Sequence, residues 1–155
     1  MKLSLDTGVA IEVLRGRQPH YREWLETAEA DGATLHLSSI VFHELMLAAM
    51  TSATPKFQME RVGWLASLME VETWTPDDAV EAARIRADLM KSATPVGAMD
   101  LLIAGQAINN DWTLVTGNLR ELIHVSNLRI VDWSDPAGPV DRAQVWMRLM
   151  RKPAK

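Results

Sequence analysis

The hydrophobic positions along the chain change period repeatedly, and these changes predict strands alternating with helices. Short apolar runs predict strands over residues 2–5, 34–37, 71–74, 112–115 and 128–131. Stretches with helical spacing predict helices over residues 9–14, 21–30, 41–50, 55–69, 76–91 and 99–108. This order predicts an α/β fold with a central parallel sheet and helices on both faces. Such sheets bind ligands at the carboxyl ends of their strands, where Asp6 and Thr116 fall.

The segment 134–155 has a different pattern and is predicted to be a C-terminal helical extension of a domain formed by residues 1–133. The sequence DPAGP interrupts the chain before it. The apolar side chains that follow are expected along one side of a helix, at Val140, Ala143, Trp146, Met147 and Met150. The helix ends in a basic stretch with Arg148, Arg151 and Lys152. The segment is either a packed helix with a solvated tail or an arm that contacts a partner chain or RNA.

Composition excludes several classes of protein. A chain of 155 residues with 48% hydrophobic and 23% charged residues is typical of one globular domain. The absence of cysteine excludes disulfides and thiolate metal sites and agrees with a cytoplasmic location. No signal peptide and no membrane-spanning stretch are predicted. Because the net charge is −4, any nucleic-acid site must be a local basic patch.

Three acidic residues stand in apolar surroundings and suggest a shared cation. Asp6 ends the first strand, Glu44 lies in SSIVFHELMLAAM, and Asp100 lies in VGAMDLLIAGQAI. Taken singly, Asp6 is explained by a turn and Asp100 by the dipole of its helix. Glu44 is harder to explain, because its neighbours one helical turn away are apolar and only His43 offers a local cation. Mg²⁺ or Mn²⁺ would suit three carboxylates, since both ions prefer oxygen ligands.

Four motifs, in their order and spacing, resemble the PIN-domain ribonucleases and, among these, the VapC toxins of VapBC toxin–antitoxin pairs. LDTGVAIEVLRG is similar to the opening strand, acid and helix of the family, and SSIVFHELMLAA is similar to its second motif. PDDAVEAARIRADLMKSATPVGAMDLLIAGQA is similar to the long helix, the loop and the third motif. TLVTGNLRELIHVSNLRIVDW is similar to the closing strands. The resemblance covers residues 1–133 and implies a single PIN-like nuclease domain.

This resemblance implies a divalent-metal-dependent endoribonuclease with Mg²⁺ or Mn²⁺ as its cofactor. Asp6, Glu44 and Asp100 would hold the ion and act in catalysis, with Glu121 as a fourth catalytic acid. Metal-activated water would attack the phosphorus and leave a 5′-phosphate and a 3′-hydroxyl.

The resemblance also implies supporting residues and partners. Thr116 and Asn118 would orient water or a carboxylate from behind the acids. The substrate would be tRNA or ribosomal RNA, and the chain would form a homodimer inhibited by a co-encoded antitoxin. DNA would be contacted only through that antitoxin, and no membrane would be involved.

Two departures from the family pattern keep an alternative function open. Gly8 stands where the family usually has Asn, and Val41 replaces a common Thr. The alternative is a catalytically degraded PIN fold that serves as an antitoxin-binding, co-repressor module. A haloacid-dehalogenase phosphatase needs a second Asp at the position of Gly8, and no phosphate-cradling glycine loop is present.

Basic residues and histidines complete the candidate chemistry. Arg15 is the main candidate for RNA binding, and three more arginines are expected to flank the strand-end cleft: Arg17, Arg120 and Arg129. His43 is expected to be packed or solvent-facing, and no metal-ligand spacing is found for His20, His36 and His124.

Overall fold

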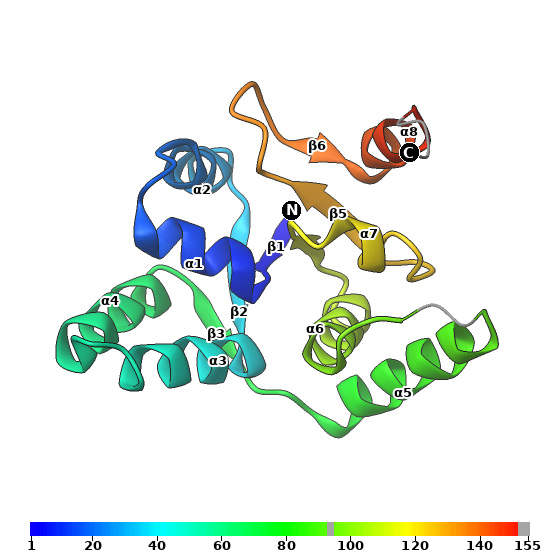
Figure 1. Cartoon of the computed structure of the whole chain (residues 1–155), viewed down its shortest axis with the longest axis horizontal. Helices are drawn as coiled ribbons and strands as arrows, with labels where there is room; N and C mark the ends of the chain where they lie inside the picture. Colours follow the sequence, from blue (N-terminus) through cyan, green and yellow to red (C-terminus); the bar gives the residue numbers. More distant parts are fainter. Residues whose placement is uncertain (93–94, 152–155) are drawn as a thin grey trace.

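The computed structural model describes residues 1–92 and 95–151, which form one sheet with helices on both faces (Figure 1). The strands are β1 (Lys2–Leu5), β2 (Thr34–Ser38), β3 (Glu70–Glu72), β4 (Thr113–Val115), β5 (Arg129–Asp132) and β6 (Val140–Asp141). The helices are α1 (Thr7–Arg15), α2 (His20–Ala30), α3 (Ser39–Met50), α4 (Pro55–Ser67), α5 (Pro76–Lys91), α6 (Ala98–Asn109), α7 (Leu119–Leu122) and α8 (Arg142–Arg151). The predicted α/β class is confirmed.

The strand order in the sheet is β3-β2-β1-β4-β5-β6. All neighbours from β3 to β5 are parallel, as predicted, and β6 adds an antiparallel edge to β5. The central strands are buried on both faces: Leu5, Leu37 and Leu114 are fully buried. Because β1 and β4 are parallel neighbours, their carboxyl ends lie side by side, and the residues that follow them, Asp6 and Thr116, meet at one edge of the sheet.

The helices divide between the two faces. In Figure 1, α1, α2 and α4 lie on the left of the sheet and α5 and α6 on the right. The α5–α6 pair crosses closely at Gly105, where an added Cβ would lie 2.7 Å from the backbone nitrogen of Ala82. Asp78 of α5 is buried and accepts hydrogen bonds of 2.8 and 3.0 Å from the side-chain amides of Asn109 and Asn110. These contacts fix α6, and with it Asp100, against α5.

Local sequence explains several element ends. Ser38 caps α3 by accepting a hydrogen bond from the backbone N–H of Ile40. Thr75 and Asp78 form a reciprocal capping box at the start of α5, directly before the predicted helix start at Pro76. The strand predicted over residues 71–74 is shifted, because β3 pairs with β2 only over Glu70–Glu72.

The C-terminal segment differs from its prediction. Residues 140–141 form β6 instead of the first helical turn, since they pair with β5. The predicted apolar side of the helix is exposed at Ala143, Trp146, Met147 and Met150, whereas Val145 is buried. The guanidinium of Arg142 donates to the carbonyls of Ile123, Val125 and Leu128, and these bonds fix where α8 begins.

The basic end of this segment is only partly visible. Arg148 is ion-paired with Asp135 at 2.9 Å, and Lys152 lies outside the described residues, as does the side chain of Arg151. The division into a domain of residues 1–133 and an extension of residues 134–155 stays a prediction.

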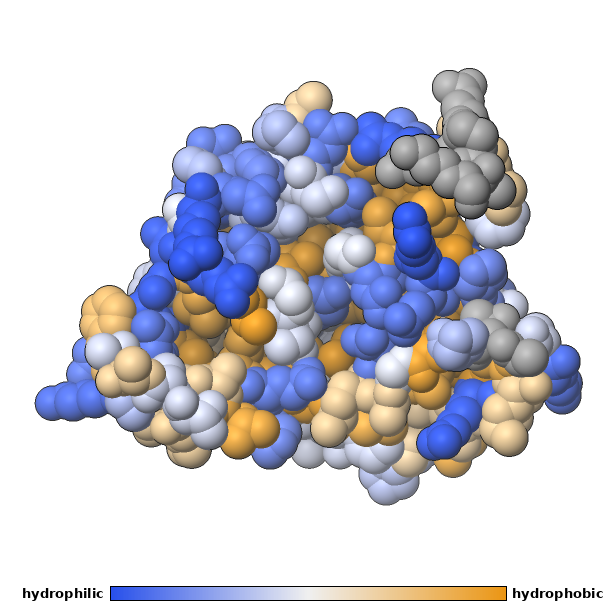
Figure 2. Space-filling model, in the orientation of Figure 1, coloured by the Kyte–Doolittle hydropathy of each residue, from blue (hydrophilic) through white to orange (hydrophobic). Residues whose placement is uncertain are grey.

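Large apolar side chains are exposed on the outer surface of α3 and α4. They are Leu47, Met50, Phe57 and Trp64. Figure 2 shows orange and pale-orange atoms over these helices, at the lower left of the view. Exposed apolar patches are typical of interaction surfaces. Within the described ranges, no helix is long and apolar enough to cross a membrane.

Candidate active site

Asp6 lies at the carboxyl end of β1, the central strand, and caps α1. Its backbone N–H donates to the carbonyl of Val115 at 3.0 Å, and its Oδ1 accepts from the backbone N–H of Val9 at 2.7 Å. The residue is only 5% exposed. Capping needs no charge, because Ser and Asn cap helices as well as Asp does. The cap therefore explains the position of Asp6 but not why a carboxylate is buried there.

A chain of hydrogen bonds joins Asp6 to Asp100. The buried hydroxyl of Thr116 donates to Oδ2 of Asp6 and accepts from the backbone N–H of Asn118 at 3.0 Å. The side-chain amide of Asn118 donates to Oδ2 of Asp100 at 2.8 Å. The loop after β4 thus holds one oxygen of each acid. Thr116 and Asn118 therefore contact Asp6 and Asp100, and their supporting role stays a prediction.

Glu44 projects from the second turn of α3 and is half-buried. Its Oε2 accepts a hydrogen bond from the hydroxyl of Thr7, in the first turn of α1. The contact orients Glu44 toward the strand ends without neutralising it. His43, the only cation near it in sequence, is exposed as expected.

Glu121 lies on α7, one turn beyond Asn118. Its Oε2 accepts a hydrogen bond of 3.0 Å from the backbone N–H of Gly97, the residue that caps α6. The bond ties α7 to the start of the helix that carries Asp100. Asp100 itself is half-buried in the first turn of α6.

The four acids act on one another electrostatically. Burial raises the pKa of Asp6, and the charge of Asp100 raises it further, against hydrogen bonds that lower it. Burial likewise raises the pKa of Asp100; its hydrogen bond from Asn118 lowers it, and the charges of Glu121 and Glu44 add to the increase. Mutual effects of this kind require the acids to lie close together in a poorly solvated place. Each carboxylate is therefore less stable here than in a free aspartate, and a bound cation would offset this.

The donor set fits a hard divalent cation. In the described part of the chain, none of the four acids takes part in an ion pair, so their charges have no side-chain cation to offset them. Carboxylate oxygens are the ligands that Mg²⁺ and Mn²⁺ prefer. The acids are more widely spaced than a closed metal cage: among described residues, only a group at His36 has all its ligand atoms within 4.8 Å. A wide acidic site suits Mg²⁺, which keeps several of its waters.

The predicted basic residues are less well placed. Arg129 is the first residue of β5 and pairs with Asp111 at 2.6 Å, so it lies at the opposite end of the sheet and its predicted place beside the cleft is wrong. Arg15 is exposed at the far end of α1 and pairs with Glu12 at 3.2 Å. Arg17 and Arg120 are exposed.

Gly8 has room for a side chain beside Asp6. A Cβ built on it would lie 3.5 Å from Oδ1 of Asp6, which is an ordinary contact. The fold therefore does not require glycine here. Asp6 is already held by Thr116 and by the N–H of Val9, so it does not depend on a side chain at position 8.

Two groups of contacts were not predicted from the sequence. Thr7 was given no role, although its place directly after Asp6 put it within reach of the site. His36 was judged to have no metal-ligand spacing, because its partners Glu70 and Glu72 come from a strand far along the chain.

Comparison with known proteins agrees with this geometry. The PIN domain family matches residues 3–128. The tRNA(fMet)-specific endonuclease VapC of Salmonella typhimurium is 33% identical over 133 residues, which are 86% of this chain and 98% of the relative. The DNA-bound VapBC of Salmonella typhimurium has a chain of similar structure, with a TM-score of 0.80, 33% identity, and coverage of 86% of this chain and 98% of that chain.

A second solved structure agrees. It is VapBC2 from Rickettsia felis, bound to a DNA fragment from the promoter, with a TM-score of 0.82, 27% identity, and coverage of 86% of this chain and 100% of that chain. The chain therefore belongs to the PIN domain family, in its VapC group.

Proposed function

We propose that this chain is a divalent-metal-dependent endoribonuclease and the toxin of a toxin–antitoxin pair, acting in the cytoplasm. One observation carries the proposal: four carboxylates without an ion-pair partner among the described residues surround the carboxyl ends of β1 and β4. Burial raises the pKa of Asp6 and of Asp100; the charge of Asp100 adds to the increase for Asp6, and the charges of Glu121 and Glu44 add to it for Asp100. Burial of that much negative charge is costly and is offset by a cation.

Each residue has a proposed task in phosphodiester hydrolysis. Asp6, Glu44 and Asp100 would hold Mg²⁺ or Mn²⁺, and the bound ion would supply Lewis acidity toward the scissile phosphate and make water a stronger nucleophile. Thr116 would position Asp6 and Asn118 would position Asp100, each through a hydrogen bond to Oδ2. Glu121, held by the N–H of Gly97, would orient the attacking water. Water adds to phosphorus and the bond to the 3′ oxygen breaks, giving a 5′-phosphate and a 3′-hydroxyl.

Substrate and partners follow from the relatives. The relative from Salmonella typhimurium is a tRNA(fMet)-specific endonuclease, so tRNA is the proposed substrate class. Solved relatives are VapBC complexes bound to DNA. We therefore propose a co-encoded antitoxin as the protein partner, DNA contact only through that antitoxin, and a homodimer as the assembled form.

The proposal is tested with purified full-length chain and total tRNA in Mn²⁺, in Mg²⁺ and in chelator. The expected result is cleavage only with metal, and products whose sequenced ends carry a 5′-phosphate and a 3′-hydroxyl. Asp6→Asn and Asp100→Asn should lose the cleavage and should relieve growth arrest on expression. Asp77→Asn, which changes an exposed acid at the start of α5, is the matched control and should behave as wild type.

Equal toxicity of wild type and both site variants at equal protein level would contradict the catalytic role. The binding-module function would then be the better one.

A further inference from the structure

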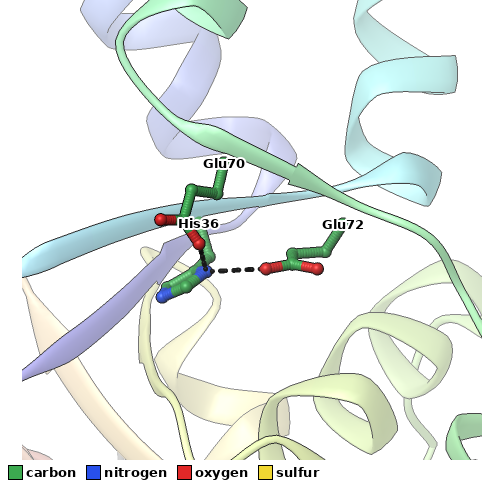
Figure 3. A group of neighbouring side chains, drawn as sticks. All are labelled: His36, Glu70 and Glu72. Atoms are coloured by element: carbon green, nitrogen blue, oxygen red, sulfur yellow. Dashed lines mark hydrogen bonds and ion pairs between the residues drawn. The ribbon is translucent and has the colours of Figure 1, made fainter.

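A second group of potential metal ligands lies on the strands β2 and β3, outside the nuclease site. His36 of β2 faces Glu70 and Glu72 of β3 (Figure 3). The Nδ1 atom of His36 lies 3.1 Å from Oε1 of Glu72 and 3.6 Å from Oε2 of Glu70. The parallel register places His36 opposite Glu70, and the period of two along β3 puts both glutamates on the same face. This is the only such group among the described residues whose ligand atoms all lie within 4.8 Å.

The imidazole of His36 is held rigidly with one nitrogen aimed at the glutamates. Its side chain is only 6% exposed and stacks on Trp112, with ring centroids 4.9 Å apart and planes 13° apart. Its other nitrogen, Nε2, lies 3.0 Å from the hydroxyl of Thr34, which is not one of the potential metal ligands. A hydrogen bond from the remote ring nitrogen to an oxygen acceptor is the usual support of a metal-ligating histidine. In the tautomer whose Nε2–H donates to the hydroxyl of Thr34, Nδ1 carries a lone pair directed toward Glu70 and Glu72.

This arrangement lacks positive charge. Among the described residues, neither Glu70 nor Glu72 has an ion pair with any lysine or arginine. Two carboxylates carry a charge of about −2. A protonated imidazole would offset only half of that charge, whereas a divalent cation offsets all of it.

The distances fit a tetrahedral ion with nitrogen and oxygen ligands. Ligand bonds of roughly 2.0–2.1 Å place two ligand atoms of tetrahedral Zn²⁺ about 3.3 Å apart. The two separations from Nδ1, 3.1 and 3.6 Å, lie on either side of that value. We propose that His36, Glu70 and Glu72 form a second metal site, selective for Zn²⁺-class cations over Mg²⁺, with water as the fourth ligand.

Such an ion would hold the edge strand β3 to its neighbour β2. The strand β3 has only three residues and pairs with β2 alone. Glu70 is 68% and Glu72 38% exposed at the side chain, so the site is open to solvent on the β3 side. A bound ion would cross-link the two strands through side chains, which stabilises the native state because the unfolded chain holds no such site. The proposal is independent of the nuclease function.

The experiment uses the full chain with Asp6→Asn and Asp100→Asn, which removes two acids of the nuclease site. Zn²⁺ is titrated by calorimetry in 5–10 mM Mg²⁺ (on the order of a saturating concentration for a weak carboxylate site). One Zn²⁺ per chain is expected, with a raised melting temperature. Long-range ¹H–¹⁵N spectra should show the Nδ1 resonance of His36 shifting, while exposed His124 does not shift.

Matched variants make the outcome decisive. Glu70→Gln and Glu72→Gln change exposed residues of an edge strand and should each weaken Zn²⁺ binding about tenfold or more. The control Glu60→Gln, which removes an exposed acid on α4, should bind as the parent does. No Zn²⁺ binding, or binding that leaves His36 Nδ1 unshifted and survives Glu72→Gln, would overturn the proposal and leave an ion pair only.

Discussion

The side-chain amide of Asn118 donates to Oδ2 of Asp100 at 2.8 Å and ties the loop after β4 to the first turn of α6. Asn118 also donates its backbone N–H to Thr116, whose hydroxyl holds Asp6. One polar chain therefore positions two acids that come from distant parts of the sequence. The loop after β4 thus couples the positions of the two carboxylates.

Removing the Asn118 amide should therefore impair catalysis without unfolding the protein. Asn118→Ala should lower the rate of RNA cleavage at saturating Mn²⁺ by about 10- to 100-fold, as is usual for residues that orient metal ligands. Single-turnover cleavage rates measure the effect. Gln18→Ala, an exposed amide between α1 and α2, is the control. An unchanged rate at saturating metal would show that Asp100 needs no such support.

Removing one acid from the site should stabilise the protein without metal, whereas with metal the intact site should be the more stable one. In chelator, Asp100→Asn should melt above wild type, because it relieves repulsion among the acids. Mn²⁺ at a hundredfold excess over its dissociation constant should stabilise wild type by about 2.7 kcal/mol and should hardly affect Asp100→Asn. Glu121→Gln should keep more of the Mn²⁺ effect, because Glu121 is proposed to orient water. Thermal melts with chelator and with Mn²⁺ decide this, and a wild type that Mn²⁺ does not stabilise would contradict the metal site.

The pH dependence of stability should have a definite sign. Burial raises the pKa of Asp6 and of Asp100 in the folded state, so protonation favours the native state. The contribution of these two groups is fully present below the unfolded pKa of about 3.9 and is lost as pH rises through the folded pKa. In chelator, the stability advantage of Asp100→Asn should be largest near neutral pH and should shrink toward pH ~4. Urea unfolding across this range measures it.

Asp88 provides a control, because its contribution to stability should change with pH in the opposite direction. A hydrogen bond from Lys91 lowers its pKa, so its contribution is present above the unfolded pKa and is lost as pH falls through the folded pKa. Asp88→Asn should therefore lose stability at neutral pH and match wild type in acid. An Asp100→Asn advantage that is the same at neutral and acid pH would contradict the raised pKa of Asp100.

A substitution of Arg15 tests whether bound RNA extends along α1, away from the acids. The residue is exposed, and the helix of nine residues puts it roughly 13 Å from Asp6. Arg15→Glu should weaken RNA binding and reduce the salt slope by about one unit if Arg15 contacts one phosphate. Binding isotherms at several salt concentrations, in an Asp6→Asn background that does not cleave, provide the measurement. Arg86→Glu on α5 is the control, and an unchanged slope for Arg15→Glu would assign Arg15 to the ordinary surface.

Two glycines in helices should respond oppositely to alanine. A Cβ at Gly105 would lie 2.7 Å from the Cβ and backbone nitrogen of Ala82, so Gly105→Ala should push α5 from α6 and destabilise the fold by about 1–3 kcal/mol. Gly63 lies inside α4 with nothing within 4 Å of an added Cβ. Gly63→Ala should stabilise the fold by about 0.5–1 kcal/mol through lower chain entropy. Equal effects in denaturant unfolding would contradict the close helix crossing.

The sequence by itself determined the order of the main strands and helices and the three acids that stand out from apolar surroundings. Both are local signals, because the period of apolar side chains and the contrast between a charge and its neighbours extend over only one or two turns. The Asp6, Glu44 and Asp100 positions were visible because each is a charge where its neighbours predict burial.

Tertiary structure decided everything that depends on register between distant segments. The contact of Thr7 with Glu44 and the group of His36 with Glu70 and Glu72 join residues whose sequence neighbours give no hint of each other. The elements α7 and β6 were not predicted either, because α7 carries two charged residues among its four and β6 is only two residues long. Val145 rather than Trp146 is buried next to the start of α8, where β6 pairs with β5 and the guanidinium of Arg142 donates to three backbone carbonyls. These long-range contacts leave no trace in the local apolar pattern.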